Sequence, residues 1–368
     1  MIDYGNALND YYVTIGPATA ASVARPSTPV PVRLPRVTSG TFKVQPIDMD
    51  TLYSVLLSMK PSMATGVDGV SVTMIQKFFP GLGDAILDIV NTSLVTGQVP
   101  PQWKHAIVTP IPKGRIAKNP AEMRPISILP GIMKIVERVV QGQLVEYLET
   151  HRLLAAQQHG YRRMHSTETA LNVITDRVLH AMDNRDISIL VLLDLSKCFD
   201  VVPHQQLLQK LHLYGVSTDW FSSYLAGHVQ QVRVRSVNGS SITSQPRDNT
   251  IGVFQGGSLS CVLYMIFAND LSLHMPDGVS IIQFADDTQI LVTGKKHNLP
   301  HLISLMEAAL DSAFQWFCHN SMKVNAARTQ MLVLGTSAML RNLPPITVKF
   351  CGSIIGDSRT VKKSRSAS

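Results

Sequence analysis

A strand of the buried type that ends in an acidic residue constrains the fold of this chain more than any other feature. Residues 187–194 are almost continuously apolar until Asp194, and such a run is typical of a strand that is buried on both faces. A second apolar stretch, at 279–284, leads to the adjacent acids Asp286 and Asp287. A carboxylate at the end of a buried strand is costly unless something positive meets it. The pattern therefore predicts a central sheet whose strands carry acidic groups at their ends.

Each of these acids also has an ordinary explanation when it is taken alone. An aspartate after a strand commonly forms or caps a turn, and a pair of aspartates is a common hairpin tip. Two such strands in one sheet would nevertheless bring their carboxylates together, and like charges at close range favour a divalent cation. Aspartates that hold two Mg²⁺ ions form a site for in-line phosphoryl transfer. We therefore expect Asp194, Asp286 and Asp287 to be catalytic.

Hydrophobic periodicity elsewhere predicts helices and strands that intermix along the chain. Helical patterns lie at 48–59, 71–97, 132–148, 167–184, 205–214, 218–225, 258–273 and 299–320. Strand patterns lie at 106–112, 187–194, 229–237, 279–284, 288–292, 322–324 and 331–334. Such an order around a central sheet predicts an α/β or α+β fold, and it excludes a solenoid or a helix bundle.

The composition excludes other classes of protein. Hydrophobic residues make up 45% of the 368 residues and charged residues 16%, which excludes a wholly disordered chain. The net charge of +7 suits an anionic partner such as a nucleic acid. The longest unbroken apolar run, at 261–268, is far shorter than the roughly 18 residues needed to span a bilayer. No membrane partner is therefore expected.

The N-terminus and the cysteines indicate an intracellular protein, without distinguishing nucleus from cytoplasm. Asp3 and Asp10 stand where a signal peptide needs a positive charge and then an apolar block, so secretion is not expected. The four cysteines form no C-x-x-C pair, so neither a zinc site nor a disulfide framework is expected. Five prolines within 17–37, without helical or strand period, predict a disordered, proline-rich leader over residues 1–45.

Seven short segments follow one another in an order that is typical of one family. They are PIPK at 110–113, MRPIS at 123–127, QHGYRRMHSTET at 158–169, LDLSKCFD at 193–200, GVFQGGSLS at 252–260, FADD at 284–287 and SMKVNAART at 321–329. Together they resemble the motifs of reverse transcriptases from non-LTR retrotransposons, the LINE-type and jockey-like elements. The resemblance covers about residues 46–355, with 92 residues between Asp194 and Asp286.

This resemblance implies a right-hand polymerase fold with fingers, a palm and a central antiparallel sheet. Residues 46–186 are expected to form the fingers, 187–355 the palm with the catalytic aspartates, and 356–368 a basic truncated tail. Family members usually carry an endonuclease before the fingers and a thumb after the palm. We therefore expect the thumb to be largely missing, as in a fragment or a truncated copy. The implied function is RNA-directed DNA synthesis, with an RNA template, a DNA primer and dNTPs as partners.

The same resemblance assigns roles to the acidic residues. Asp194 and Asp286 are expected to ligate two Mg²⁺ ions, for which Mn²⁺ can substitute. The backbone carbonyl of Leu195 is expected to help hold one of these ions, and Asp287 to support the site.

Five further residues match the nucleotide contacts of the family. Lys113 and Arg124 correspond to ligands of the triphosphate, and arginine suits phosphate because its planar fork binds two oxygens at once. Phe199 stands at the position of the family's sugar gate, although an ordinary core aromatic is the alternative. Gln255 and Gly256 match the residues that flank the incoming base and the template.

Four arginines are candidates for contacts with a nucleic-acid backbone. They are Arg162, Arg163, Arg233 and Arg235. A solvated basic face explains each of them equally well.

The chain departs from the family pattern at Cys198, Phe254, Cys261 and Arg328, where alanine, proline, proline and lysine are usual. Arg328 keeps the charge of the lysine but is a poor proton donor. A catalytically silent remnant with the same fold, which binds RNA or has no activity, is the alternative function. An RNA-directed RNA polymerase is disfavoured, because Phe199 would exclude a ribose 2′-hydroxyl. Oligomeric state and template preference are left open.

Overall fold

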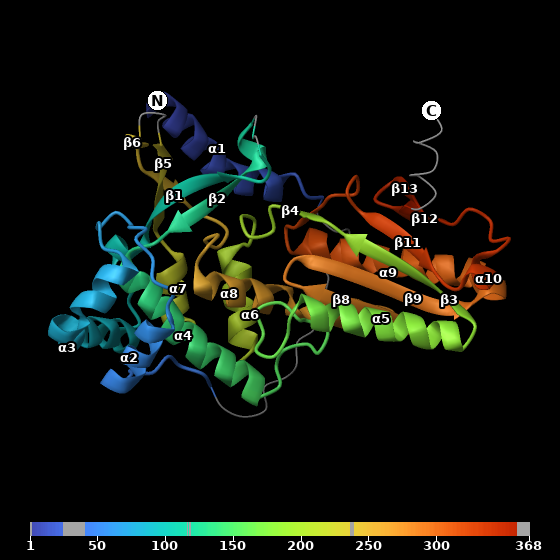
Figure 1. The fold of residues 1–368 in the computed structure, drawn as a ribbon, viewed down its shortest axis with the longest axis horizontal. Coiled ribbons are helices and arrows are strands. Elements are labelled where there is room, and N and C mark those ends of the chain that lie inside the picture. The colour runs from blue at the N-terminus through green and yellow to red at the C-terminus, as the bar shows by residue number, and fades with distance from the viewer. Residues whose placement is uncertain (1, 25–40, 116, 118, 236–238, 359–368) are drawn as a thin grey trace. The chain divides into compact units, whose positions relative to one another are not determined.

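The computed structural model describes residues 2–24, 41–115, 117, 119–235 and 239–358 (Figure 1). Within it the chain divides into two compact units. The first unit consists of Met1–Ala18, Pro35–Leu153 and Phe199–Ile266, and the second of Thr19–Leu34, Leu154–Cys198 and Phe267–Ser368. The predicted division into fingers and palm at 186/187 is a different partition, and it stays a prediction.

A five-stranded sheet forms the centre of the first unit. Its strands are β1 (His105–Pro112), β2 (Met123–Ile128), β5 (His228–Arg235), β6 (Ser241–Thr243) and β7 (Arg247–Asn249). β1 pairs with β5 in parallel, while the other pairs are antiparallel. The helices are α1 (Ile2–Ala21) for most of its length, α2 (Met49–Ser58), α3 (Val72–Thr96), α4 (Gly131–Thr150), α6 (His204–Leu213), α7 (Asp219–Leu225) and the larger part of α8 (Ser258–Ala268). Two single-turn 3₁₀ helices lie at Pro101–Lys104 and Pro120–Glu122.

The second unit is built on a four-stranded antiparallel sheet in the order β11-β3-β9-β8. These strands are β3 (Asp186–Leu193), β8 (Val279–Phe284), β9 (Asp287–Lys295) and β11 (Gln330–Leu334). Two small antiparallel ladders join β4 (Leu195–Ser196) to β10 (Lys323–Val324) and β12 (Thr347–Phe350) to β13 (Ser353–Gly356). The helices are α5 (Thr167–Asp183), α9 (Leu299–His319) and α10 (Ser337–Leu340), with 3₁₀ turns at Asn269–His274 and Lys296–Asn298.

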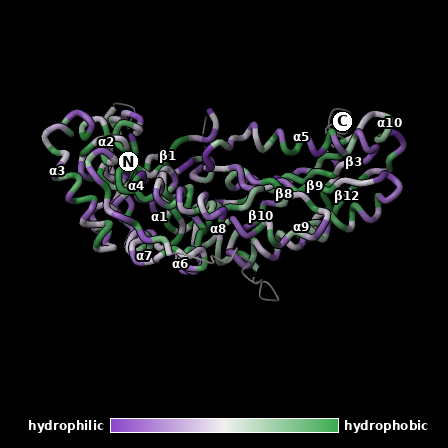
Figure 2. The backbone as a smooth tube through the Cα atoms, turned by 90° about the horizontal axis from the view of Figure 1, so that it is seen from below, coloured by the Kyte–Doolittle hydropathy of each residue, from purple (hydrophilic) through white to green (hydrophobic). Residues whose placement is uncertain are grey.

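Two helices cover opposite faces of this sheet. Ile174 and other apolar residues of α5 pack against Leu190 and Leu291. α9 packs against the other face, where Leu302 lies beside Gly294, since residues three positions apart on a strand point to opposite sides. Burial on both faces explains the continuous apolar run that marks β3 in the sequence, and the strands β3, β8 and β9 carry mainly hydrophobic colours in Figure 2. The mixed helix and sheet architecture predicted from the sequence is confirmed.

The predicted disordered leader over residues 1–45 is wrong for its first part, because Ile2–Ala21 form helix α1. Leu8 and Tyr12 are buried against Val108 of β1 and Val232 of β5. The Asn9 amide nitrogen donates to the carbonyl oxygens of Gln230 and Gln245. The helix is therefore stabilised by residues more than 200 positions away, which a search for local periodicity does not detect. Most of the proline-rich stretch, at 25–40, lies outside the described residues.

Helix α3 is long and apolar enough to cross a membrane by length and composition alone. No long unbroken apolar run marks it in the sequence, because polar residues interrupt the helix at intervals. Its buried residues, which include Ile75, Phe79 and Val90, face the interior of the first unit, and the helix packs against α2 and α4. A core helix passes the same test of length and composition, so the expectation of no membrane partner stays a prediction.

Candidate active site

The structure brings the three predicted acids together at one end of the sheet in the second unit. β3 and β9 pair in register up to Leu193 and Thr288, so Asp194, the next residue of one strand, lies beside Asp287, the first residue of the other. Asp286 occupies the two-residue turn between β8 and β9, since Phe284 pairs with Asp287. The antiparallel register thus brings the three carboxylates together, as the two acidic strand ends in the sequence predicted.

The other two carboxylates affect the ionisation of Asp287. Burial raises the pKa of Asp287, and the negative charges of Asp286 and Asp194 raise it further. Like charges at close range make ionisation of the last group less favourable. The site therefore carries a concentration of negative charge that a cation would relieve.

Two side chains hold the acids in place, and neither was assigned a role from the sequence. Asn325 donates from its side-chain nitrogen to Oδ2 of Asp194 over 3.0 Å, and its backbone nitrogen donates to the Asp194 carbonyl over 2.8 Å. The thiol of Cys198 donates to Oδ2 of Asp286 over 3.1 Å. Asn325 belongs to the motif at 321–329, and that motif is the signal in the sequence by which it can be found.

Leu195 and Arg328 lie beside the same acid. Leu195 begins β4 and pairs with Val324 of β10, which fixes its backbone next to Asp194. Arg328 Nη1 lies 4.0 Å from Oδ2 of Asp194, with 74% of the Arg328 side chain exposed. An ion pair this long and this exposed contributes little to stability.

The turn that carries Asp286 is held by the segment that begins at Gln158. The side-chain oxygen of Gln158, which is fully buried, accepts hydrogen bonds from the backbone nitrogens of Gly160 and Ala285. Ala285 has a φ of +57°, a conformation that non-glycine residues seldom adopt. The buried glutamine thus fixes the backbone directly before Asp286, and this explains the place of Gln158 in the motif at 158–169.

The donor set suits Mg²⁺ rather than a metal enclosed by protein ligands alone. Among the described residues, no group of three or more His, Cys, Asp or Glu side chains is arranged to hold a metal ion. Mg²⁺ is usually held by one or two carboxylates together with substrate phosphates and water. Asp194 and Asp286 offer two such carboxylates at one end of the sheet, so the residues present fit this ion. The four cysteines, all of which lie among the described residues, form no disulfide.

The predicted triphosphate contacts lie on the β1–β2 hairpin of the first unit. Arg124 is exposed on β2 and pairs with Ile111 of β1. Lys113 follows β1 directly, and its side-chain nitrogen donates to the carbonyl of Ala121 over 3.1 Å. Both cations therefore project from the same end of one hairpin.

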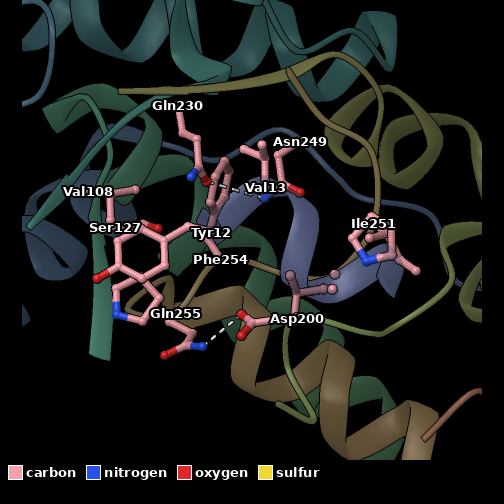
Figure 3. Close-up of a pocket in the computed structure, with 15 residues that line it drawn as sticks. Tyr12, Val13, Val108, Ser127, Asp200, Gln230, Asn249, Ile251, Phe254 and Gln255 are labelled. Carbon is pink, nitrogen blue, oxygen red and sulfur yellow. Dashed lines mark hydrogen bonds between the residues drawn. The ribbon is translucent and has the colours of Figure 1, made fainter. Parts of the chain in front are cut away.

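The glutamine-glycine loop lies against β2 of the same unit. The Gln255 carbonyl accepts a hydrogen bond from the Ser127 nitrogen over 2.8 Å, and its side-chain nitrogen donates to Oδ1 of Asp200 over 2.7 Å (Figure 3). Gly256 is exposed beside it. The structure thus places the loop of Gln255 and Gly256 beside β2, the strand that carries Arg124.

Phe199 is half-buried, and its ring stacks on that of buried Tyr264 with centroids 4.6 Å apart. This environment suits a core aromatic and a sugar gate alike, so the gate stays a prediction. The residues assigned to the nucleotide all belong to the first unit and the three aspartates to the second.

The four arginines have different surroundings. Arg162 Nη1 donates to the carbonyl oxygens of Ala155 and Gln158, which is a structural task within its own loop. Arg233 is half-buried, whereas Arg163 and Arg235 are exposed. Contacts of these arginines with nucleic acid stay a prediction, and Arg162 has the strongest structural explanation.

The first unit also contains a buried acid that the sequence pattern does not indicate. Glu137 of α4 is 1% exposed; it accepts hydrogen bonds from the Tyr224 hydroxyl over 2.6 Å and from the Ser258 backbone nitrogen over 2.9 Å. Burial raises the pKa of Glu137, against the opposing effect of these hydrogen bonds. Because Ser258 begins α8 two residues after Gly256, Glu137 anchors the helix that follows the glutamine-glycine loop.

Comparison with known proteins gives the same family as the motifs. Residues 111–358 match the family described as reverse transcriptase (RNA-dependent DNA polymerase). The chain is 28% identical over 334 residues to a probable RNA-directed DNA polymerase from transposon BS of Drosophila melanogaster, covering 87% of this chain and 34% of that relative. It is 30% identical over 253 residues to the RNA-directed DNA polymerase from mobile element jockey of the same organism, covering 65% and 26%.

A more distant relative is the Pol polyprotein from type-1 retrotransposable element R2 of Popillia japonica, 26% identical over 307 residues, with 80% of this chain and 40% of that protein covered. The chain spans about a third or less of the length of the first two relatives. The family match extends over more than half of the chain and includes the β3 and β8–β9 strand ends where the three aspartates meet. On these grounds the chain belongs to the reverse transcriptase (RNA-dependent DNA polymerase) family.

Proposed function

We propose that this chain performs RNA-directed DNA synthesis as part of a non-LTR retrotransposon protein, adding dNTPs to the 3′-hydroxyl of a DNA primer on an RNA template. The observation that carries the proposal is the meeting of Asp194, Asp286 and Asp287 at one end of an antiparallel sheet. In a member of this family, such a cluster is the expected place of phosphoryl transfer. The polypeptide would act inside the cell.

The proposal gives each acidic residue a distinct task. Asp194 and Asp286, with the backbone carbonyl of Leu195, would hold two Mg²⁺ ions, or Mn²⁺ in their place. When bound, such ions lower the pKa of the attacking hydroxyl and neutralise the triphosphate. Asp287 would support the site by adding negative charge beside these two ligands. Asn325 and Cys198 would keep the two ligand carboxylates in one orientation through the hydrogen bonds that they donate.

The basic and polar residues of the first unit would bind the nucleotide. Lys113 and Arg124 would contact the triphosphate, since both project from one end of the β1–β2 hairpin. Gln255 and Gly256, held against β2, would flank the incoming base and the template. These residues would orient the nucleotide, and orientation contributes to rate by converting a bimolecular encounter into a positioned reaction.

Primer extension by the purified chain tests this function. We expect template-dependent products when the chain is given an RNA template, an annealed DNA primer, dNTPs and Mg²⁺, and no products when the metal is removed by a chelator. Absence of extension with both Mg²⁺ and Mn²⁺, from a chain that is folded by circular dichroism, would favour the catalytically silent remnant. Binding of the primer-template measured in parallel would then show whether the remnant still holds RNA.

Replacing Phe199 by valine is expected to admit ribonucleotides. If the ring occupies the space of a 2′-hydroxyl, its removal lowers the preference for dNTPs over rNTPs by about tenfold or more, since rejection of the ribose depends on that clash. The measurement is the ratio of kcat/KM for the two sugars. Phe78→Val on the exposed side of α3 is the matched control, with no change expected. A ratio that also stays unchanged in Phe199→Val would return Phe199 to the role of a core aromatic.

A further inference from the structure

Helix α1 lies against the part of the first unit that carries Asp200 and Gln255 (Figure 3). Tyr12, Val13, Gly16 and Pro17 of α1 line a cavity of about 20 Å³ together with Asp200 and Gln255. A cavity of that size has room for about one water molecule and not for a nucleotide. The contact between α1 and this region is therefore a packing contact. Helix α1 can affect nucleotide binding only by fixing the positions of the residues that it contacts.

The closest approach of α1 to this region is at Gly16. A Cβ atom added to Gly16 would lie 2.3 Å from the carbonyl oxygen of Asp200 and 3.3 Å from Cγ2 of Ile251. Neither the helix nor the Asp200 backbone leaves room for a side chain at that point, because the first obstacle is a backbone atom. Glycine is the residue that permits such an approach of two backbones.

A second glycine confines the same segment. Gly252 has a φ of +84°, and a Cβ there would lie 2.8 Å from the carbonyl oxygens of both Phe199 and Asp200. The Phe199 carbonyl accepts a hydrogen bond from the Val253 nitrogen over 2.9 Å. The backbone of Phe199 and Asp200 is thus enclosed by two glycines, Gly16 of α1 and Gly252 of the loop before Gln255.

Movement of the Asp200 backbone would reach both nucleotide contacts of this region. The Phe199 ring, stacked on Tyr264, is attached to the adjacent residue. The side chain of Gln255 donates to Oδ1 of Asp200 over 2.7 Å. A displacement at Asp200 therefore changes the position of the ring and of the glutamine together.

Contacts of α1 with the sheet of the first unit oppose a displacement of the helix. Leu8 is 1% exposed against β1 and β5. Asn9 makes three hydrogen bonds, two donated to backbone carbonyls and one accepted from the Gln230 side chain over 3.0 Å. Asp10 pairs with Arg247 over 2.6 Å. A side chain added at position 16 would therefore displace the Phe199–Asp200 segment, since the preceding turns of the helix are bound to the sheet.

We propose that α1 is a specificity-determining element, in which Gly16 is a positioning residue for Phe199, Asp200 and Gln255. The helix sets where the sugar gate and the base-flanking glutamine stand, and through them which nucleotide is accepted. The proposal rests on the proposed polymerase function for its readout in nucleotide selection. Its structural half, the control of the 199–200 segment by α1, does not depend on activity.

The test compares two glycines of the same helix. Gly16→Ala adds a Cβ against the Asp200 backbone, whereas Gly5→Ala adds one whose nearest neighbour would be the Ser244 Cβ at an ordinary 3.6 Å. Both substitutions introduce the same methyl group, but Gly16 precedes Pro17 within the helix and Gly5 lies in its first turn, so their intrinsic effects on the helix also differ. In amide hydrogen exchange of the free protein, we expect Gly16→Ala to speed exchange in segments 199–203 and 252–255 by about tenfold or more, and Gly5→Ala to leave it unchanged.

The second readout is nucleotide selection during primer extension. We expect Gly16→Ala to raise KM for dNTPs and to lower the ratio of kcat/KM for dNTPs over rNTPs by roughly fivefold, while Gly5→Ala retains the parent values. Faster exchange with an unchanged ratio would reduce α1 to a scaffold helix and overturn the specificity claim. Unchanged exchange in Gly16→Ala would overturn the positioning claim itself.

Two further outcomes are distinguished as follows. If Gly16→Ala does not fold, Leu8→Ala loosens α1 from β1 and β5 without adding an atom near Asp200, and it is expected to give the same changes in exchange and in selection; parent-like values would overturn the proposal. If the unsubstituted chain extends no primer, the proposed function fails. The exchange comparison then still decides whether α1 positions the 199–200 segment.

Discussion

Replacing Asp194 or Asp286 by asparagine is expected to reduce primer extension by more than about 100-fold while the fold stays intact, since the loss of a metal should cost several kcal/mol of barrier. Each change removes one charged oxygen ligand and keeps the size of the side chain. The hydrogen bonds from Asn325 and Cys198 to these residues can be accepted by the remaining amide oxygen. The measurement is the rate of single-nucleotide addition at saturating Mg²⁺, with thermal unfolding as the check on folding.

Asp186→Asn is the matched control for this pair. Asp186 lies at the other end of β3 and pairs with Lys295 over 2.9 Å, so its substitution makes the same chemical change on the same strand away from the cluster. We expect its extension rate to equal that of the parent within about twofold, because partly exposed ion pairs contribute little. A rate above about a hundredth of the parent in Asp194→Asn or Asp286→Asn would contradict the two-metal assignment.

Replacing Glu137 by alanine is expected to lower the free energy of unfolding by roughly 3 to 5 kcal/mol, the sum of a lost buried acceptor and a new cavity. The change leaves the Tyr224 hydroxyl and the Ser258 nitrogen without their acceptor inside the first unit. Because α8 begins at Ser258, the Gln255–Gly256 loop loses its support at the same time. Denaturant unfolding measures the loss, and Glu146→Ala, at an exposed position of the same helix, should stay within about 0.5 kcal/mol of the parent.

The same residue should give the stability a dependence on pH. Burial raises the pKa of Glu137 above its usual 4.5, so the folded chain holds this proton more tightly than the unfolded chain does. The contribution of Glu137 to the free energy of unfolding is therefore greatest below the unfolded value and declines as the pH rises towards the folded value. Glu137→Gln should remove that decline. An identical slope in Glu137→Gln and in the parent would show that Glu137 does not titrate in this window.

The elements that could be predicted from the sequence are those in which the local pattern of apolar residues indicates which side chains are buried. The run that became β3 is apolar throughout because both faces of that strand are covered, and the periodic residues of α9 face one side of the same sheet. The acids at the ends of β3 and β8 were found in the same way, since a charge directly after a buried strand is conspicuous. Local pattern and tertiary environment agree at these positions.

The rest depends on partners that are distant in the sequence. Helix α1 owes its place to Val108, Val232 and Gln230, so nothing near it in the chain indicates its burial. Glu137 looks like one polar residue within an amphipathic helix until Tyr224 and Ser258 are seen around it. From the sequence, Arg162 is a candidate for binding phosphate. The structure shows that it donates to two backbone carbonyl oxygens instead, and such partners cannot be identified from the sequence. Tertiary hydrogen bonds of this kind are not encoded in periodicity.

The first unit draws on three separate stretches of the chain, and this has a consequence for its synthesis. Strand β5 and the loop that follows it belong to the last stretch, Phe199–Ile266, and Asn9 bonds to Gln230 across 221 positions. A ribosome releases the chain from its N-terminus onwards, so Leu8 and Tyr12 of α1 emerge long before the surface that buries them. Contacts between such distant residues slow folding, because the loop between them must close first. The nascent chain therefore exposes the apolar side chains of this segment until the last stretch has been made, and it is in this interval that a chaperone would act on it.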